Sequence, residues 1–69
     1  MKIEYDPDRD LLYLLFSGEN VKAAETETIK PGVLADFDKD GILIGIEIID
    51  ASEIIGKNIE IKLPKVVTV

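Results

Sequence analysis

An acidic segment that ends in glycine, set between two strand-like runs, restricts the fold of this chain more than any other feature. Residues 36–41 alternate aspartate with other side chains and end at Gly41, which matches the spacing of an EF-hand calcium loop. A calcium loop lies between two amphipathic helices, whereas residues 42–48 place isoleucine at every second position, the period of a β-strand. This context favours a hairpin turn held by Asp38 and Gly41. The alternative is a site for a divalent cation or small ligand, formed by Asp36, Asp38, Asp40 and Glu47.

The apolar faces of the two runs predict how this hairpin is paired. A four-residue loop over residues 38–41 points the apolar residues of both strands to one side. A shift by one residue would instead set the isoleucine row opposite Asp36 and Asp38. Burying these carboxylates against apolar side chains costs more free energy than a preferred turn type contributes. We therefore expect a positive φ at Gly41 and the following opposed pairs: Phe37 with Ile42, Ala35 with Ile44, and Val33 with Ile46.

Strand and turn signals in the rest of the chain predict a mainly β fold. Pro31 and Gly32 predict a tight turn, and Asp50 with Glu53 has the spacing of a capping box at the start of a helix. We expect a single domain over residues 1–69, an antiparallel β-meander with one short helix near residues 51–55 and a C-terminal strand extension. The expected strands are residues 2–5, 11–16, 21–29, 33–37, 42–48 and 59–69, with an edge or bend at Pro64.

Composition excludes several classes of function. The chain has no histidine and no cysteine, so it has no histidine base, thiol nucleophile, disulfide or ordinary structural zinc site. A net charge of −6 repels nucleic acid and anionic membranes, and no apolar run is long enough to span a bilayer. The sequence indicates no enzymatic activity and no cofactor, and we expect a cytoplasmic protein. Hydrolysis by a carboxylate pair remains the catalytic alternative.

The run at residues 11–16 is apolar on both faces, so both faces of that strand need cover. One row should pack against the isoleucines of residues 42–48, and the other must be covered by the short helix with the C-terminal strand or by a second copy. A chain of 69 residues without disulfides is near the size at which one core is marginal. We therefore expect self-association through Leu11, Tyr13 and Leu15.

Several segments together resemble the family known as domain of unknown function 2283. They are Tyr5-Asp6-Pro7, residues 10–14 with Phe16-Ser17, residues 36–41, and residues 45–52, the last being the most specific. The resemblance covers about residues 1–55 and implies a compact, mainly β, prokaryotic domain without catalytic residues. It also implies an antitoxin-like role, because some relatives are encoded beside candidate toxins. This chain departs from the family pattern at Leu15 and in its continuation through residues 57–69.

Three functional hypotheses follow. The first is an acidic protein-interaction module, as a homodimer or with a small protein partner. The second is the divalent-cation or small-ligand binder, although we expect no tight calcium binding because Asp36 and Glu47 should not converge on an ion held by the turn. The third is the carboxylate hydrolase. Glu47 is in the same expected strand as the isoleucines, but its side chain should point to the other face of the sheet. It should therefore either face solvent or pair with a basic side chain across an interface. The richness in isoleucine, glutamate and lysine resembles that of proteins from hot-growing organisms.

Overall fold

A computed structural model describes residues 1–18 and 20–56, and there the chain forms five strands and one helix. The mainly β fold class and the short helix are confirmed. The expected strand extension over residues 59–69 lies outside the described residues. The helix has neither the length nor the apolar character to cross a membrane. The elements are β1 (Lys2–Asp6), β2 (Leu11–Leu15), β3 (Glu25–Lys30), β4 (Val33–Phe37), β5 (Leu43–Ile49) and α1 (Ala51–Ile54).

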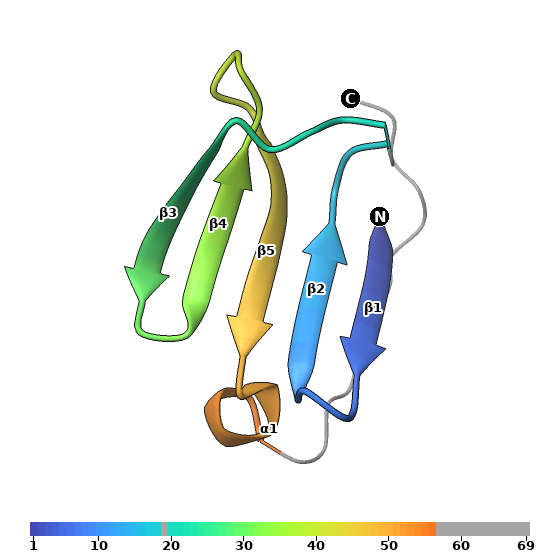
Figure 1. The fold of residues 1–69 in the computed structure, drawn as a ribbon, viewed down its shortest axis with the longest axis vertical. Helices are drawn as coiled ribbons and strands as arrows, with labels where there is room; N and C mark the ends of the chain where they lie inside the picture. Colours follow the sequence, from blue (N-terminus) through green and yellow to red (C-terminus); the bar gives the residue numbers. More distant parts are fainter. Residues whose placement is uncertain (19, 57–69) are drawn as a thin grey trace.

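The five strands form one antiparallel sheet in the order β1-β2-β5-β4-β3 (Figure 1). This order is not that of a plain meander. Strands β1 and β2 form one hairpin, and β3, β4 and β5 follow one another as a second set of neighbours. The pairing of β2 with β5 joins the two sets. The polar strand expected over residues 21–29 is shorter, and it lies at the sheet edge as β3, where all of its residues are exposed.

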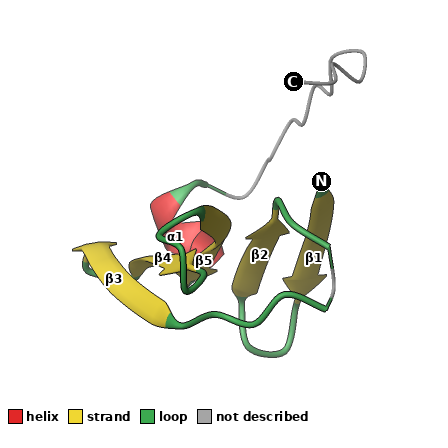
Figure 2. Ribbon diagram, turned by 90° about the horizontal axis from the view of Figure 1, so that it is seen from above, coloured by secondary structure: helices red, strands yellow, loops and turns green. Residues whose placement is uncertain are grey.

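The described part of the core lies between the sheet and α1, which packs against one side of the sheet (Figure 2). Leu12 and Ile48 are directly opposed across β2 and β5, and both pack with the fully buried Ala51 of the helix. The expected packing of the β2 row against the isoleucines is therefore confirmed for Leu12, which packs with Ile48. The neighbouring pair is Leu14 with Ile46.

The expected pairing of β4 with β5 is wrong by two residues. Ala35 lies opposite Ile46 instead of Ile44, and Val33 lies opposite Ile48. The register shifts between Asp36 and Phe37, where β5 contains one extra residue, as in a β-bulge. Because the period of a strand is two residues, a shift of two leaves Val33 and Ala35 on the predicted face. Ile42 falls outside the row and is 61% exposed.

The turn between β4 and β5 is the one expected from its aspartate and glycine. The Gly41 amide donates to the Asp38 carbonyl at 3.0 Å, and the Asp38 carboxylate accepts from the amides of Asp40 and Ile42 at 2.8 and 2.9 Å. Gly41 has a φ of 79° and Gly32 a φ of 85°. The predicted positive φ at Gly41 is therefore confirmed, and Gly32 likewise takes the conformation expected of its turn.

Gly41→Ala should lower the free energy of unfolding by about 1 kcal/mol, because a Cβ is disfavoured at positive φ. No atom lies within 4 Å of the added Cβ, so the cost is conformational. Gly18→Ala is the matched control, since Gly18 has equally open surroundings and a φ outside the left-handed region. Urea unfolding measures both variants, and an equal loss in the two would contradict the prediction.

The start of α1 is capped by a residue from the turn between β1 and β2, so the expected capping box is wrong. Asp50 has a left-handed φ of 54° and makes no side-chain cap. The Asp10 carboxylate instead accepts from the amide and the hydroxyl of Ser52, and the Asp10 carbonyl accepts from the Ala51 amide at 2.9 Å. The Tyr5 hydroxyl also donates to the Asp10 carboxylate, at 2.7 Å. Hydrogen bonds from Ser52 first, and from Tyr5, lower the pKa of Asp10.

Asp10→Ala should lower the urea midpoint of unfolding more than Asp50→Ala does. Both aspartates have a left-handed backbone, with φ of 52° and 54°, so the same substitution brings a similar backbone penalty at each site. The difference between the variants then isolates the hydrogen bonds that Asp10 makes to Ser52 and Tyr5. Equal midpoints would show that this remote cap does not stabilise the fold.

Candidate functional site

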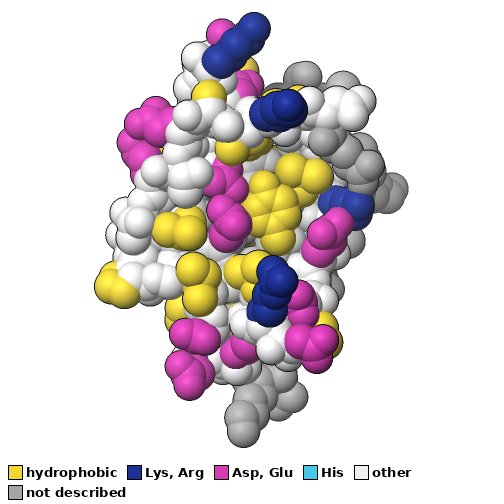
Figure 3. Space-filling view, in the orientation of Figure 1, with side chains coloured by type: hydrophobic (Ala, Val, Ile, Leu, Met, Phe, Trp, Pro, Cys, Tyr) yellow, Lys and Arg dark blue, Asp and Glu magenta, His cyan; other side chains and the backbone are white. Residues whose placement is uncertain are grey.

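The sheet face opposite α1 carries a half-buried group of apolar and acidic side chains, and we call it the Tyr13 face. Alternation along β2 and β5 sends every second residue away from the helix. Tyr13 lies directly opposite Glu47, which in turn lies opposite Leu34 of β4. Figure 3 shows hydrophobic side chains gathered over the middle of the sheet, with charged side chains around them. The residues that define this face are Leu11, Tyr13, Leu15, Leu34, Ile49, Asp36 and Glu47.

Gly45 allows the Tyr13 side chain to lie flat across the central strand. A Cβ on Gly45 would stand 2.5 Å from the Tyr13 hydroxyl oxygen and 2.9 Å from its Cζ, closer than real contacts allow. Glycine in the middle of a strand usually weakens it, and a close approach by another group is a common reason to find it there. Gly45 is also opposite Asp36 of β4, so the tyrosine hydroxyl reaches over β5 toward that carboxylate.

Asp36 is the one buried charged side chain among the described residues, at 4% exposure. The Thr26 hydroxyl, from edge strand β3, donates to its Oδ1 at 2.6 Å. A buried carboxylate needs such donors, because removal from water is otherwise costly. The sheet order supplies this donor, since β3 follows β4 at the edge and places Thr26 opposite Asp36.

Glu47 stands beside Asp36, an arrangement that differs from both options expected for it. Burial raises the pKa of Glu47 first, and the hydrogen bond and negative charge of Asp36 raise it further. Burial also raises the pKa of Tyr13, with added contributions from the charges of Asp36 and Glu47. Glu47 and Tyr13 therefore hold their protons more tightly than exposed groups of the same type do.

The register of β4 and β5 explains why sequence reasoning missed this pair. The observed pairing sets Leu34 opposite Glu47, so Asp36 becomes a diagonal neighbour of Glu47 on the same face. In the expected register, the two carboxylates would have stood two residues farther apart. Asp36 and Glu47 therefore meet each other on the Tyr13 face. The expectation that they do not converge on an ion held by the turn stays a prediction about calcium binding. One signal in the sequence was Gly45, a single glycine within the isoleucine-rich run of residues 42–49. A glycine inside a strand often indicates a bulge or the close approach of another group.

The calcium-loop residues are divided between two places. Asp36 and Glu47 meet on the Tyr13 face, whereas the Asp38 carboxylate accepts backbone amides within the turn. Within residues 1–18 and 20–56, no three acidic side chains are arranged to hold a metal ion. A separate hollow of about 370 Å³ lies at the end of the sheet, lined by residues 20–24 and 38–40. Neither arrangement reproduces the expected ligand set of Asp36, Asp38, Asp40 and Glu47.

The three residues expected at an interface share one face. Leu11, Tyr13 and Leu15 alternate along β2 away from α1, and each is half-buried within the described chain. Their neighbour across β5, Ile49, is 43% exposed. The short helix therefore does not cover this row, since Ala51 packs on the opposite side with Leu12 and Ile48.

Glu47→Gln should change how stability depends on pH. The folded state binds the Glu47 proton more tightly than the unfolded chain does, so the contribution of this group to stability declines as pH rises through its raised pKa. Glutamine has no such proton, so the variant should gain stability relative to the wild type over the pH range that begins at the ordinary glutamate pKa and rises above it. Urea unfolding across this range measures the effect, with Glu27→Gln on exposed β3 as the control. Parallel profiles for Glu47→Gln and the wild type would contradict it.

The chain belongs to the family described as Protein of unknown function (DUF2283), whose model matches residues 2–52. The matched residues include the Asp10 cap and the Tyr13 face, and the match confirms the resemblance read from the sequence. No curated protein and no solved structure matches the chain.

Proposed function

We propose that this member of the DUF2283 family is a non-catalytic protein-interaction module that forms a homodimer through the Tyr13 face. The supporting observation is that the apolar residues of this face point away from the helix that packs on the other side of the sheet. Soluble monomers rarely expose a large contiguous apolar patch, and such patches usually mark an interaction surface. The apolar members are Leu11, Tyr13, Leu15, Leu34 and Ile49.

The small size of the core supports the same proposal. Two of the five buried hydrophobic residues in the described part are alanines, so the core contains few large side chains. Small domains bury a small fraction of their apolar surface and often gain stability from association. A second copy packed on the Tyr13 face would bury leucine, isoleucine and tyrosine side chains that one copy leaves partly exposed. The buried hydrophobic residues are Leu12, Ala35, Ile44, Ile48 and Ala51.

A small protein partner, as in an antitoxin-like complex, would compete for this face. The net charge of −6 favours a basic partner. We prefer the second copy because a two-fold axis lets each apolar row on this face bury its own counterpart, with no further chain required. Purified protein distinguishes the two, because a homodimer forms without any partner.

Leu15→Arg should convert the dimer to a monomer, because a charge placed in a desolvated interface is not compensated. Light scattering of the purified protein at tens of micromolar would give the mass of each variant. Ile42→Arg is the control, since Ile42 is an equally apolar residue, 61% exposed, in the turn beyond the Tyr13 face. A monomeric wild type, or a Leu15→Arg variant that remains dimeric, would refute the proposal.

A further inference from the structure

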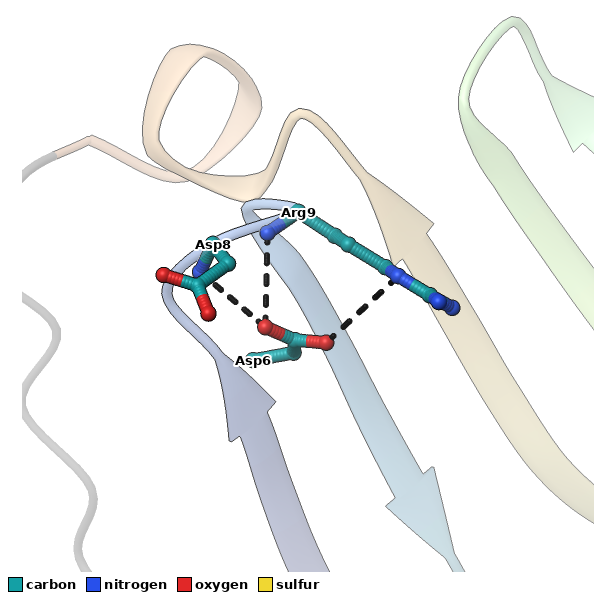
Figure 4. Close-up of polar contacts among 3 residues, drawn as sticks. All are labelled: Asp6, Asp8 and Arg9. Carbon is teal, nitrogen blue, oxygen red and sulfur yellow. Dashed lines mark hydrogen bonds and ion pairs between the residues drawn. The ribbon is translucent and has the colours of Figure 1, made fainter.

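Charged side chains of β1 and of the turn after it lie on the Tyr13 face together with the carboxylate pair. Lys2 and Glu4 of β1 form an ion pair with each other at 2.9 Å. Arg9, in the turn between β1 and β2, has a side chain that is 80% exposed. Its Nε lies 3.8 Å from Asp6 Oδ2, at the outer limit of an ion pair. The other oxygen of Asp6 accepts the backbone amides of Asp8 and Arg9 at 3.0 and 3.3 Å (Figure 4). Asp6 is thus mainly a turn residue, and it holds the guanidinium loosely.

Arg9 extends over the same face as the carboxylate pair. Asp6 lies opposite Leu11, which places it on the Tyr13 face. Figure 4 shows the Arg9 side chain running from the turn across β2 toward β5. The guanidinium therefore lies near the row of Leu11 and Ile49, whereas Asp36 lies in the row of Leu15 and Gly45. The row of Tyr13 and Glu47 lies between these two rows.

This separation of charge limits how two copies can meet. A two-fold axis through the carboxylates would bring four acidic groups together out of water, where like charges are strongly unfavourable. An axis in the plane of the face that crosses the strands between the Leu11 row and the Tyr13 row exchanges these two rows and keeps Glu47 off the axis. That arrangement sets the guanidinium of each copy over the carboxylates of the other, and it makes the surface self-complementary.

We propose that in the homodimer Arg9 of the partner subunit binds the Asp36–Glu47 carboxylates, and that Arg9 of the first copy does the same in return. This inference rests on the proposed homodimer and specifies its geometry. A planar guanidinium can donate to both carboxylates at once, and each copy would supply one to the other. The apolar residues around Tyr13 would exclude water from the two contacts, which strengthens them.

Reversal of charge tests the geometry. Arg9→Glu should raise the dimer dissociation constant about tenfold or more, because it adds a third carboxylate to each site. Glu47→Arg should do the same, and the double variant Arg9→Glu with Glu47→Arg should restore dimerisation, since the swapped charges again attract. Lys39→Glu is the control, because it makes the same charge change at an exposed turn residue outside the Tyr13 face. Analytical ultracentrifugation measures the constants, and circular dichroism confirms that each variant folds.

The outcomes separate this inference from the proposed function. A monomeric wild type overturns both. A dimeric wild type that Leu15→Arg dissociates, but whose dissociation constant is the same in Arg9→Glu as in Lys39→Glu, keeps the homodimer and overturns the role of Arg9. Should Glu47→Arg not fold, Arg9→Glu still decides, because Arg9 is exposed and outside the core. Its effect should shrink as sodium chloride is raised to about 0.5 M, since salt screens the charges, and an effect independent of salt would count against the contact.

Discussion

The antiparallel pairing of β2 with β5 is the interaction on which the rest of this structure depends. These strands are distant in sequence, and their contact joins the first hairpin to the remaining three strands. The same pairing opposes Leu12 to Ile48 at the core on one face and Tyr13 to Glu47 on the other. It also brings the end of β5 beside the start of β2, which places Asp10 at the first turn of α1. The register of β2 with β5 therefore determines the core, the helix cap and the candidate site together.

Asp10 and the Asp36–Glu47 pair differ in how well hydrogen-bond donors compensate their negative charge. Asp10 accepts hydrogen bonds from Ser52 and Tyr5, and its lowered pKa shows that the ionised form is favoured. Asp36 and Glu47 instead lie side by side, where burial and mutual repulsion raise the pKa of Glu47. Like charges partly removed from water cost stability unless a cation is supplied. This cost is the physical reason why we propose that the guanidinium of a second copy binds at the Tyr13 face.

Much of the fold could be predicted from local signals. The alternation of isoleucine in β5 and the double-faced apolar run of β2 predicted these strands and the faces they bury, because side-chain direction follows a period of two. Gly41 and Gly32 marked the turns, since glycine has no Cβ and adopts a positive φ without a steric penalty. The clustering of Leu11, Tyr13 and Leu15 on one face followed from the same alternation. The register of β4 with β5 and the helix cap were predicted wrongly, because each depends on a partner elsewhere.

The sequence by itself determined the strands, the turns, the buried faces and the absence of histidine and cysteine chemistry. Each of these depends on residue type and on spacing within a few positions. Only the tertiary structure decided that Asp10 caps α1 from 42 residues away, and that Asp36 and Glu47 meet beneath Tyr13. A two-residue slip leaves every apolar side chain on its face, so hydrophobic pattern alone cannot choose between the registers. The bulge between β4 and β5 made that choice, and it brought the two carboxylates together.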